Sequence, residues 1–229
     1  MSAQFNTATN FSGQQVIGAG ALVTLISMVG GLGSLIRDLL LINRIGFGAE
    51  LDGFYLVMML PMLFVSVFTL PLGDTLASAL GRIKSSRQAQ RMLGATLSAS
   101  LLLSGLIVAL LLANAGTIFR GFVNGAGIDQ VHLILPAALM LFLLSGLVVS
   151  GNSLMNHLCK PVLTASFQLI VPILSIVAIL AAPIKWSILM AVAGMALGQL
   201  LNLVALYFVV KAEGYQLLPG SLNLNYFGT

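Results

Sequence analysis

Six long runs of mostly apolar residues constrain the fold of this chain more than any other feature. A helix needs about 20 consecutive apolar residues to cross the hydrocarbon core of a membrane. The six runs extend over Val16 to Ile42, Asp52 to Leu80, Met92 to Ala113, Val131 to Leu154, Val162 to Ala182 and Trp186 to Val210. With 59% hydrophobic and 7% charged residues, the chain differs sharply from soluble domains, which are about 45–50% apolar and about 25% charged. The sequence therefore predicts an all-α integral membrane protein with six transmembrane helices.

The polar segments divide the chain into three parts. Residues 1–15 contain no Lys or Arg, so they lack the basic start of a cleaved signal peptide and are interpreted as a polar N-terminal tail. Residues 16–211 hold the six predicted helices, whose short connections require neighbouring helices to be antiparallel. Residues 212–229 are interpreted as a C-terminal tail or the start of a linker.

Lys and Arg are unevenly distributed between the two ends of the predicted helices. With a cytoplasmic N-terminus, the inner side holds six basic residues and the outer side holds three. The inner residues are Arg82, Lys84, Arg87, Arg91, Lys160 and Lys211, and the outer residues are Arg44, Arg120 and Lys185. Because cytoplasmic connections are enriched in Lys and Arg, this asymmetry predicts that both termini lie in the cytoplasm. Topology explains the basic connection at 82–91 better than nucleic-acid binding does, and contact with anionic lipid head groups is a further interpretation.

Few residues are suited to catalysis or to metal binding. Cys159 is the one cysteine, so no disulfide forms within the chain, and together with His157 it supplies only two metal ligands. The sequence GGLG at residues 30–33 lies within an apolar helix rather than after a strand, which argues against a phosphate-binding loop. We therefore expect that the protein is not an enzyme and that it has no metal site and no cofactor.

Arg37 and Asp38 lie inside the first apolar run, where charged side chains are costly. An ionised side chain costs about 2.5–3.5 kcal/mol at the centre of a membrane helix, so both residues are candidate functional groups. Arg37 lies seven residues before Arg44, which places it about 10 Å below the outer end of the helix. Asp38 is rotated by about 100° from Arg37 and is not expected to pair with it. The remaining candidate partners of Arg37 are Asp52, a group on another helix and the substrate. The structural alternative is that Arg37 and Asp38 anchor a helix break through backbone contacts.

The outer connection carries further charged residues. Arg44, Glu50 and Asp52 flank it, and solvated or ion-paired positions are usual for such residues.

Glycine and proline interrupt the first two predicted helices. Gly30, Gly31 and Gly33 fall inside the first helix, and Pro61 and Pro71 fall inside the second. Proline removes a backbone donor and glycine permits bending or close approach, so these positions predict a helix break and a hinge. Ordinary helix packing is the alternative interpretation of each residue taken singly.

The stretch RDLLLINRIGFGAELDGFYLVMMLPMLFVSVF resembles the first two helices of the MurJ/MviN-type lipid II flippase family, which belongs to the multidrug/oligosaccharidyl-lipid/polysaccharide exporter superfamily. The residues that match this family in order and spacing are Arg37, Asp38, Arg44, Phe47, Gly48, Asp52, Phe54, Leu60 and Pro61. The later run LPAALMLFLLSGLVVSGNSLMNHLCKPVLTASFQLIVPIL is similar to the fourth and fifth helices of the family. The resemblance therefore extends over nearly the whole chain.

The resemblance implies one lobe of a two-lobe flippase, since family members have about fourteen helices in two six-helix lobes plus two more. The sequence departs from the family where cavity arginines are expected, because these positions hold Gly31, Val65 and Ser66. A pyrophosphate-linked substrate loses charge-assisted contacts at those positions. The departure favours a polyprenyl-linked glycan other than lipid II.

The resemblance implies transport of a polyprenyl-linked glycan precursor for cell-wall or exopolysaccharide synthesis in the bacterial inner (cytoplasmic) membrane. The candidate substrate-binding residues are Arg37, Asp38, Arg44 and Asp52, with Arg37 facing the anionic head group and the aspartates acting as electrostatic partners or ion-coupling sites. The hinge candidates are Gly30, Gly31, Gly33 and Pro61. The expected partners are the lipid-linked glycan, membrane lipids, and a second copy or another chain that supplies the second lobe. The alternatives are a non-transporting scaffold subunit of a polysaccharide assembly complex and a drug or metabolite exporter.

Overall fold

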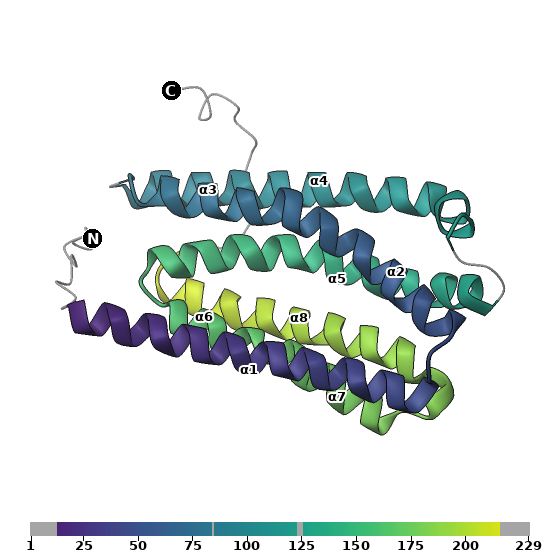
Figure 1. The fold of residues 1–229 in the computed structure, drawn as a ribbon. Coiled ribbons are helices and arrows are strands. Elements are labelled where there is room, and N and C mark those ends of the chain that lie inside the picture. The colour runs from purple at the N-terminus through teal and green to yellow at the C-terminus, as the bar shows by residue number, and fades with distance from the viewer. Residues whose placement is uncertain (1–12, 84, 123–125, 216–229) are drawn as a thin grey trace.

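The computed structural model describes residues 13–83, 85–122 and 126–215, and these form a bundle of helices without strands (Figure 1). The helices are α1 (Gly13–Ile45), α2 (Ala49–Phe64), α3 (Leu70–Leu80), α4 (Ser86–Arg120), α5 (Ala126–His157), α6 (Pro161–Gln168), α7 (Ile170–Ala181) and α8 (Ser187–Ala212). A π-helical turn, Val65–Thr69, joins α2 to α3, and a 3-10 turn, Ile184–Trp186, precedes α8. The expected tails lie mostly outside the described residues.

The prediction of an all-α membrane fold with six spans is confirmed. Five helical segments of the described chain are long and apolar enough to cross a membrane: Ile17–Ile45, Arg87–Ala115, Gly127–His157, Pro161–Ala181 and Ile184–Ala212. The sixth is the bent segment formed by α2, the π-helical turn and the shorter apolar helix that follows it. The protein is thus a multi-pass membrane protein.

The breaks in these helices differ from those expected in the first span. α1 runs without interruption through Gly30, Gly31 and Gly33, so the helix break predicted there is wrong for this conformation. A Cβ atom on Gly33 would lie 3.1 Å from Pro172, so this glycine serves close packing of α1 on α7, and one on Gly30 would make an ordinary contact of 3.4 Å with Leu169, just before α7. The small size of Gly33 is needed for this packing, and a hinge at Gly30, Gly31 and Gly33 stays a prediction.

Two bends do occur where proline removes a backbone donor. Pro172 leaves the carbonyl of Gln168 without its usual partner four residues later, and α6 ends at Gln168. Pro71, at the start of α3, leaves the carbonyl of Val67 without its usual partner, and Val67 lies in the π-helical turn Val65–Thr69. The helix break that the sequence predicted for the first two spans therefore occurs in the second span alone. π-helical turns of this kind are frequent at functional sites.

Glycines on α8 bring this helix against the backbone of α7. A Cβ atom built on Gly198 would lie 2.6 Å from Cα of Val171, and one on Gly194 would lie 2.8 Å from Cα of Ser175. Ser175, which is fully buried, donates a hydrogen bond of 3.0 Å to the carbonyl of Ala191. The Gly194 to Gly198 spacing is the small-xxx-small pattern that lets membrane helices pack closely.

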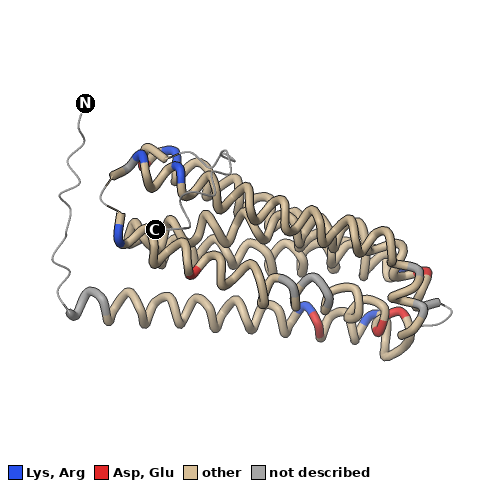
Figure 2. The backbone as a smooth tube through the Cα atoms, turned by 90° about the horizontal axis from the view of Figure 1, so that it is seen from above, with Lys and Arg blue, Asp and Glu red and all other residues tan. Residues whose placement is uncertain are grey.

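The two ends of the bundle differ in charge. Figure 2 shows a group of Lys and Arg at one end, and most of the Asp and Glu toward the other end, where a few further basic residues also lie. The basic end contains the α3–α4 and α5–α6 connections and the C-terminal end of α8, where Lys160 forms an ion pair with Glu213. Lys84 and the side chain of Arg120 lie outside the described residues. The arrangement agrees with the charge asymmetry on which the cytoplasmic placement of both termini was predicted.

This topology can be tested by cysteine labelling. Ser85 and Gly48 are exposed residues in the connections at opposite ends of the bundle. In a background without Cys159, a membrane-impermeant maleimide added to spheroplasts should label Gly48→Cys and leave Ser85→Cys unlabelled. Cys159 has a φ of 57°, so asparagine or glycine is the suitable replacement. The opposite labelling pattern would show that the termini lie outside.

Candidate functional site

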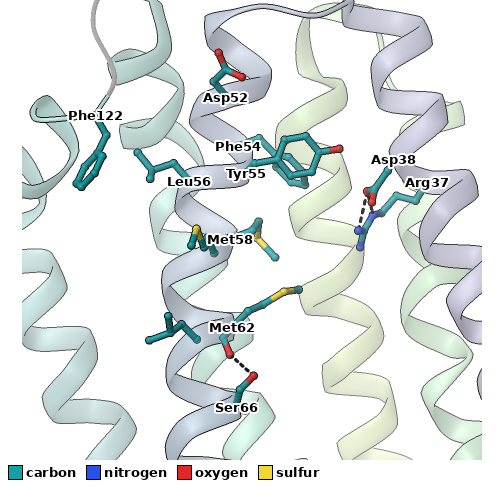
Figure 3. A pocket seen from close by; sticks show the side chains of 12 residues that line it. Arg37, Asp38, Asp52, Phe54, Tyr55, Leu56, Met58, Met62, Ser66 and Phe122 are labelled. Carbon is teal, nitrogen blue, oxygen red and sulfur yellow. Dashed lines mark hydrogen bonds and ion pairs between the residues drawn. The ribbon is translucent and has the colours of Figure 1, made fainter.

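A groove of about 860 Å³ follows the exposed side of α2 and reaches α1 (Figure 3). It exists because the first two spans separate after their tight connection: α1 packs on α6 and α7, whereas α2 packs on α5. Gly46, with a φ of 81°, allows the sharp turn between them. The residues lining the groove include Arg37, Asp38, Asp52, Tyr55, Met59, Met62, Ser66 and Phe122.

Arg37 and Asp38 form an ion pair at the α1 side of the groove. Nε and Nη2 of Arg37 donate hydrogen bonds of 2.9 and 2.8 Å to Oδ1 of Asp38. The prediction that these neighbours do not pair is therefore wrong. Neighbouring Cβ atoms do point about 100° apart, but the long arginine side chain curls around the helix far enough to reach the carboxylate.

The third nitrogen of the Arg37 guanidinium also has a partner. Nη1 lies 3.1 Å from Sδ of Met195 on α8, which is 4% exposed. Arg37 itself is 9% exposed, whereas the Asp38 side chain is 29% exposed. The buried cation is thus compensated mainly by a half-buried carboxylate, and Oδ2 of Asp38 accepts no hydrogen bond from the described residues.

Asp52 lies in the first turn of α2 and lines the same groove (Figure 3). The structure thereby brings together three of the four predicted site residues, although the ion pair forms between Arg37 and Asp38 and not between Arg37 and Asp52. Asp52 is exposed and is not part of a salt bridge in the described chain. Its carboxylate is therefore available to a ligand.

Tyr55 is a groove residue that the sequence analysis did not single out. Its ring, 39% exposed, extends from α2 toward the Arg37–Asp38 pair and packs edge-on against Phe54 (Figure 3). The available signal was its spacing of three residues from Asp52, because residues i and i+3 share one face of a helix. One turn further along, Met59 is 62% exposed.

Arg44 does not line the groove. Its guanidinium donates hydrogen bonds of 2.5 to 3.2 Å to the carbonyl oxygens of Ile179, Leu180 and Ala182, at the C-terminal end of α7. The expected solvated or ion-paired position for Arg44 is thus wrong, because the guanidinium binds carbonyls at the end of α7, where a helix lacks the usual donors four residues later. A cation at this end also interacts favourably with the helix dipole. The structure indicates that Arg44 ties α1 to α7.

Removing this cap should destabilise the protein without altering the groove. We expect Arg44→Met to lower the free energy of unfolding by about 2 kcal/mol, because three hydrogen bonds to a charged donor are lost. Thermal melting in detergent, followed by size-exclusion chromatography, measures the change. Arg87→Met, at an exposed position in the first turn of α4, is the matched control. Equal melting of both variants would show that the cap contributes nothing.

The charge of the groove follows from its lining. Among the described lining residues, one arginine stands against two aspartates, and Arg37 is already paired. Ser66, at a position where the resemblance leads one to expect an arginine, donates a hydrogen bond of 2.9 Å to the carbonyl of Met62 (Figure 3). The remaining lining consists mostly of aromatic and methionine side chains. The groove therefore combines a weakly acidic centre with apolar walls.

The described helices form an α-helical multi-pass membrane protein whose fold is similar to about half of a transporter of the multidrug/oligosaccharidyl-lipid/polysaccharide (MOP) superfamily. It is similar to the lipid II flippase MurJ in an inward closed conformation, with a TM-score of 0.73 and 18% identity over 90% of this chain and 44% of the flippase.

Two further solved structures share the fold. A MOP superfamily transporter from Pyrococcus furiosus, whose binding pocket is described as having reverse polarity, gives a TM-score of 0.71 with 15% identity over 89% of this chain and 47% of the transporter. A MATE protein in a bent conformation gives a TM-score of 0.68 with 15% identity over 89% of this chain and 48% of the MATE protein. The chain thus spans less than half the length of each structure. No model of a protein family and no curated protein matches the sequence.

Proposed function

We propose that this chain forms one lobe of an alternating-access transporter in the bacterial inner membrane. The observation that carries the proposal is the groove, which sets the polar residues Arg37, Asp38 and Asp52 beside exposed apolar walls such as Met59. A site of this kind suits an amphipathic substrate whose polar head leaves water while its hydrocarbon tail stays in lipid. The similarity to half of MurJ and of a MATE protein supports the same function.

The proposed substrate is a polyprenyl-linked glycan precursor for cell-wall or exopolysaccharide synthesis. Flipping such a lipid moves a large polar head across the membrane and requires no covalent step, so no enzymatic activity and no cofactor are proposed. The similar structure of a lipid II flippase supports a lipid-linked substrate.

One lobe does not enclose a substrate, so the proposal includes a second lobe. A second copy of the chain or another chain provides it, and the two lobes alternate in access to the two sides of the membrane. The π-helical turn at Val65–Thr69, which follows Pro61, is the proposed flexible point in the groove wall. The unbroken α1 moves as a rigid element.

The experiment compares cells with and without the protein. On depletion, the polyprenyl-linked glycan should accumulate in the inner leaflet, where a membrane-impermeant lectin added to spheroplasts does not reach it. Cross-linking in native membranes should capture the chain with a second lobe. An unchanged leaflet distribution together with loss of the assembled polysaccharide machinery would instead support the scaffold function.

A further inference from the structure

We propose that the groove on this lobe holds the sugar part of the lipid-linked glycan and not its phosphates. The inference rests on the proposed function and specifies which portion of the substrate this half of the transporter recognises. It starts from the state of Arg37, the one cation among the described groove residues.

Arg37 is poorly placed to bind a phosphate. Three of its five N–H donors are already engaged, two on Oδ1 of Asp38 and one on Sδ of Met195, and the side chain is buried at 9% exposure. Releasing the guanidinium for an anion would leave the Asp38 carboxylate without its counter-ion next to that anion. Breaking a buried pair in this way is strongly unfavourable. Arg37 is therefore a positioning residue for Asp38.

The acidic residues repel a phosphate but suit hydroxyl groups. A carboxylate only accepts hydrogen bonds, whereas sugar hydroxyls donate them. Asp52 is exposed in the groove, and Oδ2 of Asp38 accepts no hydrogen bond from the described chain. Because hydrogen bonds to charged acceptors are strong, the two carboxylates offer a directional contact to a sugar and an electrostatic barrier to a phosphate.

Tyr55 supplies the second element of a sugar site. Its ring extends from α2 toward Asp38, Asp52 lies nearer the start of the same helix, and Tyr55 is 39% exposed (Figure 3). An aromatic ring provides an apolar face together with a polar hydroxyl, which matches a sugar ring with its own apolar face and its hydroxyl rim.

The test is a binding measurement on protein purified from native membranes in mild detergent, so that a bound second lobe is retained. The probes are a polyprenyl diphosphate carrying one hexose, the same polyprenyl diphosphate without sugar, and tetraphenylphosphonium as an organic cation. We expect the sugar-bearing lipid to bind about tenfold more tightly than the sugar-free lipid, as the loss of a hydrogen bond to a charged group implies.

Substitution of Asp52 locates the contact. Asp52→Asn should weaken binding of the sugar-bearing lipid about tenfold and should not weaken binding of the sugar-free lipid. Glu50→Gln removes an exposed carboxylate from the same helix turn, outside the groove lining, and should change neither.

Equal binding of both lipids, with tighter binding in Asp52→Asn, would overturn the inference and place the phosphates in the groove. Weaker binding of tetraphenylphosphonium alone in Asp52→Asn would also overturn it and make the groove a cation site. If the protein moves no lipid-linked glycan in the leaflet experiment, the proposed function fails as well. If the protein moves the lipid-linked glycan but binds both lipids equally, recognition of the sugar by the groove fails and the proposed function stands.

Discussion

Gly198→Leu should prevent the protein from accumulating in the membrane in a folded form. A Cβ atom at this position would lie 2.6 Å from Cα of Val171 and 3.2 Å from its nitrogen. These are backbone atoms, so α7 and α8 would have to move apart and lose contacts along their length, including the hydrogen bond from Ser175 to Ala191. Overpacking of this kind costs about 1–3 kcal/mol, occasionally more.

Gly105→Leu is the matched control for this substitution. Gly105 lies within α4, and a Cβ atom there meets nothing within 4 Å. Leucine is a better helix former than glycine by nearly 1 kcal/mol, so helix propensity alone would favour both substitutions. Fluorescence-detected size-exclusion chromatography should show a monodisperse peak for Gly105→Leu and a lost peak for Gly198→Leu. Equal profiles would contradict the close packing of α7 and α8.

The Arg37–Asp38 pair should show strong coupling in a double-mutant cycle. Asp38→Asn leaves the Arg37 cation buried without a counter-ion, which costs about 3 kcal/mol for a buried pair. Arg37→Gln leaves a carboxylate that is 29% exposed and reachable by water, so it should cost less. The double variant contains no uncompensated charge and should recover most of the stability lost in Asp38→Asn. Melting temperatures in detergent measure all three, and additive losses would contradict the coupling.

The same variants separate folding from transport. Arg37→Gln should accumulate normally and yet export no lipid-linked glycan, because Asp38 loses the group that orients it at the groove. Arg37→Lys should export little more than Arg37→Gln, since lysine lacks the planar fork that places two donors on Oδ1 of Asp38. Normal export by Arg37→Gln would show that the pair serves neither binding nor gating.

The membrane fold was predictable because hydrocarbon imposes a strong constraint. A spanning segment must satisfy its backbone groups internally and must be apolar over about 20 residues, and both requirements are visible in a single sequence. The positions of the bends were less predictable. Gly30 and Gly33 predict a helix break but lie in an uninterrupted helix, and the contact that requires a small residue at Gly33 is made by Pro172 of another helix.

The site was predictable in part, because the hydrocarbon core also makes charged side chains costly. Arg37 and Asp38 stood out by their cost in a membrane, and Asp52 by its place at the start of the second span. Their pairing depended on the path of a flexible side chain, which helix geometry alone does not give. Arg44 was misjudged because its partners are backbone carbonyls of α7, which carry no sequence signal. The spacing of Gly194 and Gly198 did carry a signal, the small-xxx-small pattern, that the sequence analysis did not use.

Blocking the groove tests the central claim most directly. Met59 lines the groove and is 62% exposed, whereas Met28, at 64%, lies on α1 outside the lining. Both substitutions to tryptophan keep the core intact, so the two variants should accumulate equally. The measurement is the fraction of polyprenyl-linked glycan in the outer leaflet of spheroplasts, read by a membrane-impermeant lectin. The account predicts that Met59→Trp loses most of this fraction and that Met28→Trp retains it, and a normal outer-leaflet fraction in both variants would contradict transport through the groove.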